Sequence, residues 1–200
     1  MKREPGMSGI VETLQHYSNA AAIPVILIDD SGETLFSSHE HELCRFCSGL
    51  CSEISCSHVH LYGSYQAERF GGKYVFFCPL GVIHWASPIT LDGIMKGAVL
   101  GGPVHMVEPD EFLLSDLFVK YFSRDQLSVA IELAKKIPVV KPEKVNSLSE
   151  LLSIVASHLS GTSWNEYCME QKQHEQAADI SVHIHHLKGM LETGEEVSAY

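Results

Sequence analysis

Apolar side chains recur at helical spacing in four segments of the chain. In residues 7–21 they lie three or four positions apart, which predicts a short amphipathic helix. The same spacing returns in residues 110–122, 125–136 and 145–159, and Pro or Ser residues separate these segments, as is typical at helix ends. We therefore expect one helix near the N-terminus and three helices in the second half of the chain.

Between these segments, runs of β-branched, aliphatic and aromatic residues predict strands. Residues 24–28 and 34–36 are two such runs, and turn-forming residues join them. Three more runs follow: residues 73–78, residues 82–90 and a third run after an Asp-Gly turn, where glycine adopts a positive φ at little cost. The polar segment between the two groups becomes helical in its second half. This order predicts an α+β domain, an antiparallel sheet with flanking helices.

The chain becomes polar and helical after Gly161. Its apolar positions there alternate steps of three and four, as in the seam of a two-stranded coiled coil. These positions are Ala177, Ile180, Ile184, Leu187 and Leu191. Because so few heptads are a short signal, two interpretations stay open: the helix covers an edge of the preceding domain, or it pairs with a second copy. We expect residues 1–160 to form one domain and residues 161–200 a helical extension.

Composition and charge narrow the classes of function. The 200 residues, 45% of them hydrophobic, suffice for one ordinary core. A net charge of -11 offers little to phosphate backbones, so we expect no DNA contact by this segment itself. No window approaches the roughly 18 uninterrupted apolar residues of a membrane span, and the N-terminus lacks the apolar core of a signal peptide. We therefore expect no membrane contact and a cytoplasmic location.

Six cysteines are unlikely to form a disulfide framework in a reducing compartment. Cys44, Cys47 and Cys51 would share one face of a helix, and Cys56 lies a further turn and a half away. Thiolates and imidazoles are zinc ligands, but the spacing is not that of two CxxC pairs separated by a loop, because no second pair closes the site. We leave four interpretations open: buried thiols, redox-responsive thiols, zinc held by Cys44, Cys47, Cys51 and Cys56, or an iron–sulfur cluster.

Catalytic motifs are missing from the sequence. It contains no GxSxG elbow, no HExxH, no P-loop and no Rossmann glycine pattern, and no pair of carboxylates stands out from the acidic background. We therefore expect a protein that is not an enzyme.

A resemblance to a known family rests on the middle of the chain. Three cysteines, at 44, 56 and 78, accompany the run YVFFCPLG at residues 74–81, the sequence ASPI at residues 86–89 and a hairpin that leads into GAVLGG at residues 97–102. In these features residues 8–160 resemble the PocR ligand-binding domain, a sensory family of bacterial regulators. The resemblance implies a PAS-like antiparallel sheet with flanking helices, followed by a helical C-terminal extension, and a small organic ligand.

The resemblance also implies how the chain is used. Proteins of this kind place an AraC-type helix-turn-helix or a histidine kinase after the sensor. We expect a homodimeric, cytoplasmic transcriptional regulator of the AraC type, with a DNA-binding output domain beyond Tyr200. The ligand would shift the population between two packings, and the C-terminal helix would carry the change to the output domain. The alternatives are the sensor module of a histidine kinase, a metal- or redox-responsive cysteine switch, and a structural dimerisation module.

Strand alternation suggests which side chains face a ligand. Trp85 and His84 are adjacent in a strand, so they face opposite sides of the sheet. Trp85 is the better pocket wall, because its ring is apolar and its N–H can orient one polar group. We expect the ligand to contact Cys44, Cys56, Tyr74, Phe76, Cys78, Trp85, Ser87 and Gly101.

Overall fold

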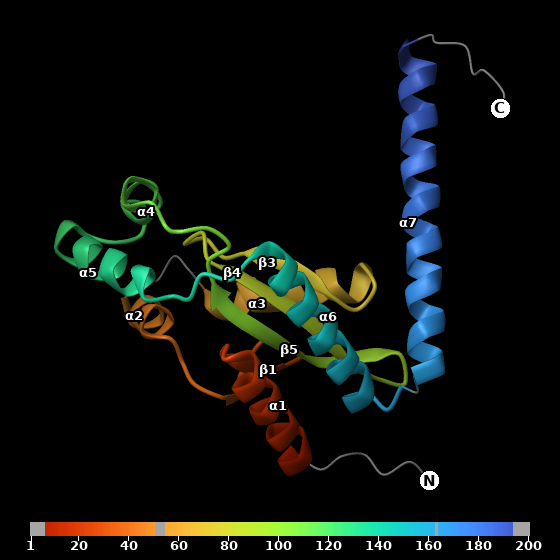
Figure 1. Ribbon diagram of the computed structural model, residues 1–200, viewed down its shortest axis with the longest axis horizontal. Coiled ribbons are helices and arrows are strands. Elements are labelled where there is room, and N and C mark those ends of the chain that lie inside the picture. Colours follow the sequence, from red (N-terminus) through yellow and green to blue (C-terminus); the bar gives the residue numbers. More distant parts are fainter. Residues whose placement is uncertain (1–6, 51–54, 163, 194–200) are drawn as a thin grey trace. The chain divides into compact units, whose positions relative to one another are not determined.

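The computed structural model describes residues 7–50, 55–162 and 164–193 (Figure 1). The chain divides into two compact units, residues 1–162 and residues 163–200. Among the described residues, every helix is too short or too polar to cross a lipid bilayer.

The described residues form one five-stranded antiparallel sheet in the order β2-β1-β5-β4-β3, which confirms the α+β prediction. The long strand β5 lies at the centre and pairs with both β1 and β4. The neighbouring β3 pairs with β4 at one edge. The strands are β1 Val25–Asp29, β2 Thr34–Ser37, β3 Tyr74–Phe77, β4 Ile83–Leu91 and β5 Ile94–Val104.

One face of the sheet is covered by α1 (Met7–Ala21) and α6 (Pro142–Leu159), which cross it in the foreground of Figure 1. Leu14 of α1 and Leu152 of α6 are fully buried against Trp85 and Val99 of the sheet. The two helices are also joined directly, because the Tyr17 hydroxyl donates a 2.6 Å hydrogen bond to the Leu148 carbonyl. This face is therefore a closely packed, predominantly hydrophobic core.

The opposite face carries α3 (Cys56–Arg69), which lies behind the sheet in Figure 1. Ser55 caps its first turn, since the Ser55 side chain accepts a hydrogen bond from the His58 backbone N–H. Ala67 packs against Phe76 of the sheet. A Cβ at Gly63 would overlap the Phe76 ring, so this glycine lets the helix approach the strand closely. The helix covers only part of this face.

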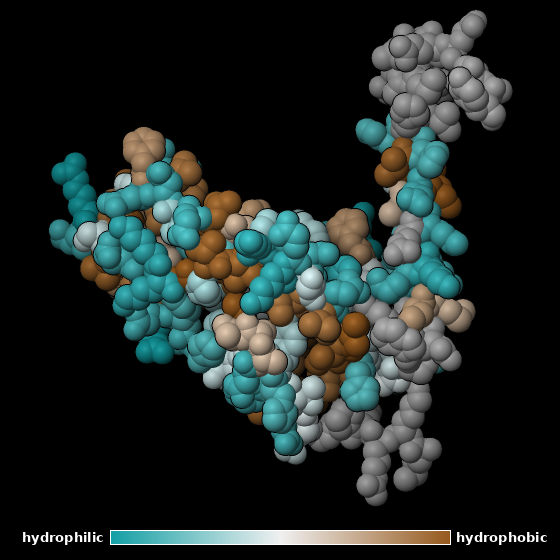
Figure 2. Space-filling model, in the orientation of Figure 1, coloured by the Kyte–Doolittle hydropathy of each residue, from teal (hydrophilic) through white to brown (hydrophobic). Residues whose placement is uncertain are grey.

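A second apolar cluster lies at the end of the sheet, around α2 (Glu42–Leu50), α4 (Glu111–Phe118) and α5 (Arg124–Lys135). An ion pair of 2.8 Å between Lys136 Nζ and Glu42 ties the end of α5 to α2. Phe112 and Leu113 of α4 point into solvent, and Figure 2 shows hydrophobic surface over this helix. This cluster holds α2 in place beside the incompletely covered face.

The second unit contains α7 (Trp164–Thr193), a continuous helix of 30 residues. Of the predicted coiled-coil seam, Ile180 and Ile184 are exposed, whereas the side chains of Leu187 and Leu191 lie outside the described residues. Pairing of this helix with a second copy stays a prediction.

Candidate functional site

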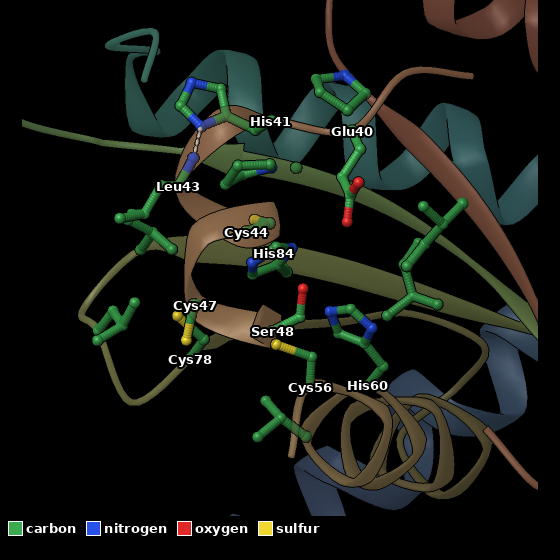
Figure 3. Close-up of a pocket in the computed structure, with 18 of the residues that line it drawn as sticks. Glu40, His41, Leu43, Cys44, Cys47, Ser48, Cys56, His60, Cys78 and His84 are labelled. Atoms are coloured by element: carbon green, nitrogen blue, oxygen red, sulfur yellow. Dashed lines mark hydrogen bonds between the residues drawn. The ribbon is translucent and has the colours of Figure 1, made fainter. Parts of the chain in front are cut away.

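A cavity of about 380 Å³ lies on the α3 face of the sheet (Figure 3). Its walls come from β1, β2, β4 and β5, from α2 and from the first turns of α3, and the polar segment 39–41 borders it. Ligand-binding cavities of proteins have volumes of this order. It is lined by Pro24, Ile26, Thr34, Ser37, His39, Glu40, His41, Leu43, Cys44, Cys47, Ser48, Cys56, Ser57, Val59, His60, Cys78, Pro79, Leu80, Val82, His84, Leu100, Gly102 and Pro103.

Strand alternation in β4 points His84 into this cavity and Trp85 to the other face of the sheet. His84 is 5% exposed, and the Phe76 ring stacks on it with 5.8 Å between the ring centroids. Gly102 has a φ of +118°, and a Cβ there would lie 2.9 Å from His84 Nδ1. Glycine thus satisfies both the backbone conformation and the space beside the imidazole.

A second imidazole, that of His60 on α3, lies 5.4 Å from His84 between ring centroids. Burial lowers the pKa of His60 to about 4 and that of His84 to about 3. Both rings are therefore neutral near pH 7, and each offers one N–H donor and one nitrogen acceptor. No hydrogen bond joins either ring to another described residue, and both rings line the cavity. Both are free to bind a polar group in the cavity.

The polar rim of the cavity is already partly engaged. His41 Nδ1 accepts a 3.2 Å hydrogen bond from the Leu43 backbone N–H, and burial lowers the pKa of His41. The Glu40 carboxylate is paired with Arg45 at 3.2 Å. No Lys or Arg is found among the described residues that line the cavity. The site therefore suits an uncharged molecule better than an anion.

Four cysteines share one side of the cavity: Cys44 and Cys47 from α2, Cys56 from the start of α3, and Cys78 from the loop after β3 (Figure 3). None of these four described cysteines forms a disulfide. A favourable interaction with the Cys47 thiol lowers the pKa of Cys56 to about 7. Burial instead raises the pKa of Cys44 to about 12 and that of Cys78 to about 11.

The thiols are not arranged as a metal site within the described part of the chain. No group of three or more Cys, His, Asp or Glu residues there could hold a metal ion. The fourth predicted ligand, Cys51, lies outside the described residues. Cys44, Cys47 and Cys56 thus do not form a ligand set by themselves. Binding of zinc or of an iron–sulfur cluster stays a prediction.

The structure brings three of the predicted ligand-contacting residues together, since Cys44, Cys56 and Cys78 all line the cavity. Phe76 and Tyr74 lie on the same face without lining it. Phe76 supports the His84 ring, and the Tyr74 ring stacks on Phe76 with 6.2 Å between centroids.

The other three predicted residues do not line this cavity, contrary to the expectation. Trp85 is fully buried beneath α1 and α6, and Ser87 is buried on the same face. A Cβ at Gly101 would overlap the Trp85 ring, so this glycine makes room for the indole in the core. The Trp85 indole fills the core of the covered face, and His84 is the residue of this pair that lines the cavity.

Sequence reasoning missed His60 and His84 as a pair. Period two correctly placed His84 and Trp85 on opposite faces, and the choice of the aromatic ring as the pocket wall was the step that failed. No sequence signal pairs the two histidines, because their contact depends on the docking of α3 onto β4.

One family model matches the chain, and its description is "Sensory domain found in PocR". The match spans residues 7–164, which include α1 to α6 and therefore every described residue of the cavity. No curated protein and no solved structure matches the chain.

Proposed function

This chain belongs to the PocR sensory-domain family, and from that premise we propose that it senses a small, uncharged organic molecule bound in the cavity on the α3 face. The family is a sensory one, which fits the lack of catalytic motifs in the sequence. The identity of the ligand, the output domain and the oligomeric state also belong to the proposal.

The observation that carries the proposal is the pair of neutral, unpartnered imidazoles of His60 and His84. Both rings line the cavity, so a ligand there could fill hydrogen-bonding positions that no described side chain fills. A ligand hydroxyl that reaches both rings would accept a hydrogen bond from the N–H of one imidazole and donate one to the unprotonated nitrogen of the other. A ligand carbonyl would only accept, from the N–H of either imidazole. The histidines would thereby select a ligand with at least one polar atom.

The remaining walls define the rest of the ligand. Aliphatic side chains from the strands and from α2 make most of the remaining lining apolar, among them Ile26, Leu43 and Leu100. The ligand class that fits is a compact molecule with an apolar part and one or two hydroxyl or carbonyl groups. Short-chain diols and simple aromatic alcohols are examples of that chemistry.

Signalling would proceed through α2 and α3, the helices that form one side of the cavity. A ligand that favours one packing of these helices by about 1–3 kcal/mol would shift the population enough for a useful switch. We place the sensor in a cytoplasmic transcriptional regulator of the AraC type, with its DNA-binding domain beyond Tyr200. The sensor module of a histidine kinase is the alternative. The exposed Ile180 and Ile184 of α7 support pairing with a second copy.

Two measurements on the purified chain test the ligand proposal. Native mass spectrometry should find a small-molecule mass excess in protein that has retained its ligand during purification. Saturation-transfer NMR with a panel of short-chain diols, simple aromatic alcohols and matched carboxylic acids should then select the uncharged compounds. Selective binding of the carboxylates would contradict an uncharged ligand, and binding that survives the loss of both imidazoles would contradict the site.

Sedimentation velocity tests the proposed pairing of α7. The chain should sediment as a dimer, and replacing Ile180 and Ile184 together by Lys should convert it to a monomer, because charges at a seam are costly to bury. The matched control places Lys at Ala178 and Val182, two exposed positions outside the predicted seam. A dimer that survives the seam variant would show that α7 is not the interface.

A further inference from the structure

The helix α4 presents an apolar face to solvent that the sensing proposal does not use. Phe112 is 74% exposed and Leu113 is 62% exposed, and Leu117 and Val119 are exposed beside them. Figure 2 shows the resulting hydrophobic surface over this helix. Single exposed apolar side chains are common on soluble proteins, whereas several on one helix are typical of a surface that another molecule covers.

A carboxylate lies in the middle of this face. At about 3.6 residues per turn, Asp116 falls one turn beyond Phe112 and Leu113. It lies opposite Leu114 and Phe118, the two residues that α4 buries. Asp116 is exposed, and among the described residues no cation pairs with it. An apolar partner without a charge would bury this carboxylate unpaired, which is costly. The partner therefore has to supply a base.

The charge around the face points the same way. Residues 107–119 contain four acidic residues and no Lys or Arg. Asp116 is also in the last turn of α4, where the partial negative charge of the helix dipole adds to its own. A second copy of this face would set like charges against each other, and an anionic membrane would be repelled. A molecule with basic residues around an apolar centre is the complementary partner.

The buried side of α4 reaches the wall of the cavity. Leu114 and Phe118 belong to the same apolar cluster as Leu43, Leu80 and Val82. Those last three side chains also line the cavity. One layer of side chains thus separates α4 from a ligand. A change in the packing of that layer would alter both the cavity and the position of the exposed face.

We propose that the exposed face of α4 is the docking surface for a basic amphipathic helix of the DNA-binding output domain, and that this contact is coupled to occupancy of the cavity. The identity of the partner rests on the proposed function, which supplies the output domain. Such domains carry clustered bases because they neutralise phosphates. A helix with an apolar stripe would cover Phe112 and Leu113, and a Lys or Arg beside the stripe would pair with Asp116.

Fluorescence anisotropy on the full chain tests the surface with a labelled helical peptide of Leu and Lys. The peptide carries Leu on one helix face and Lys on the other, and a matched peptide has Glu in place of each Lys. The Lys peptide should bind at least tenfold more tightly than the Glu peptide. Replacing Phe112 and Leu113 together by Ser should weaken the Lys peptide at least tenfold, because the apolar contact is lost.

Two controls separate this face from the rest of the acidic surface. Phe77→Ser removes an aromatic side chain that is equally exposed but lies on β3, and it should leave the affinity for the Lys peptide unchanged. Asp116→Asn should weaken the Lys peptide roughly threefold, with a smaller loss at high salt, as expected of an exposed ion pair. Glu68→Gln neutralises an exposed carboxylate on α3 and should have no effect.

Several results would overturn the docking surface. These are no binding of the Lys peptide, equal binding of both peptides, or binding that survives the Phe112 and Leu113 double variant. Conversion of a dimer to a monomer by that variant in sedimentation velocity would make the face an interface between copies. Co-flotation of the wild type, but not the variant, with phosphatidylglycerol vesicles would make it a membrane contact.

The coupling is measured by repeating the Lys-peptide titration with the best uncharged compound from the NMR panel at saturation. The peptide affinity should change by roughly fivefold or more, in either direction, and an unchanged affinity would overturn the coupling. The first titration needs no organic ligand. Loss of the docking surface would therefore leave the proposed sensor function standing, and a failed ligand screen would leave the peptide-binding result standing.

Discussion

The two faces of the sheet differ in how completely helices cover them. On one face α1 and α6 lie side by side and bury Trp85 completely; on the other α3 covers only part of the strands, and the remainder borders a cavity of about 380 Å³. The same strand, β4, supplies Trp85 to the first face and His84 to the second. The covering helices, more than the type of side chain on the strand, therefore decide where a ligand can bind.

Unpartnered polar groups are found on both faces, with different consequences. On the covered face, the hydroxyls of Ser87, Ser149 and Ser153 have no hydrogen-bond partner among the described residues and are packed against other atoms. On the cavity face, His60 and His84 border open space. A packed hydroxyl costs stability, whereas a ring beside a cavity can be satisfied by a ligand.

The largest expected effect comes from Trp85→Ala. Removing the indole leaves a void in the closely packed core, so the free energy of unfolding should fall by about 3–5 kcal/mol, as measured by urea denaturation. Phe77→Ala is the matched control, because this aromatic side chain on β3 is 67% exposed and its loss should cost less than about 1 kcal/mol. If Trp85→Ala instead kept its stability and lost only ligand affinity, the assignment of the two faces would be reversed.

The second effect is a pH dependence of the unfolding free energy that arises from the two histidines of the cavity face. The pKa values of His60 and His84 lie below the value near 6.5 of an unfolded chain, so the unfolded state binds protons first as the pH falls. Their contribution to stability is complete above about pH 6.5 and is lost as the pH falls, down to about pH 4 for His60 and about pH 3 for His84, by about 1.4 kcal/mol per pH unit for each histidine.

Urea denaturation across this pH range checks the effect. Replacing His60 by Phe should flatten the dependence of the unfolding free energy on pH, and the covered-face variant Trp85→Phe should keep the slope of the wild type. An unchanged slope in His60→Phe would mean that this imidazole is not buried in its neutral form.

A smaller effect concerns affinity alone. His84→Phe keeps an aromatic ring stacked on Phe76 and removes both ring nitrogens, so the uncharged compound that binds best in the NMR panel should lose roughly tenfold in affinity, about 1.4 kcal/mol. Titration calorimetry compares it with Trp85→Phe, the neighbouring substitution on the opposite face, for which the affinity should not change. Equal losses in both variants would indicate a general change of the sheet and would argue against a specific contact.

The smallest effect is expected from Ser87→Ala. Because the Ser87 hydroxyl is buried and has no partner among the described residues, its removal should leave the unfolding free energy within about 1 kcal/mol of the wild type or raise it. The affinity for the panel compound should be unchanged. A clear loss of affinity would return Ser87 to the site where the sequence had placed it.

Local patterns in the sequence predicted the elements well. The helix at residues 7–21 and the strands around the Asp-Gly turn lie where the periodicity placed them, because short-range spacing determines which residues can be helical or extended. The family resemblance suggested that Cys44, Cys56 and Cys78 act together, and all three line the cavity, while their contact with a ligand stays a prediction.

The choice between Trp85 and His84 could not be predicted in the same way. Alternation places them on opposite faces, but α6, which covers the Trp85 face, begins at Pro142, far along the chain. The contribution of His60 depends equally on the docking of α3 onto β3 and β4. Long-range packing of this kind has no local sequence signal, so the face that stays open had to come from the structure.

The most direct test follows side-chain nitrogens on both faces of the sheet in one sample during a ligand titration. Nitrogen-15 NMR of the wild-type chain, titrated with the best uncharged compound from the panel, follows the imidazoles of His60 and His84 and the indole of Trp85. The chain has two tryptophans, so Trp85→Phe assigns the indole signal. The account predicts that both imidazoles shift at saturation while the Trp85 indole stays in place. A shifted indole with unchanged imidazoles would contradict it, because the ligand would then lie on the face that α1 and α6 cover.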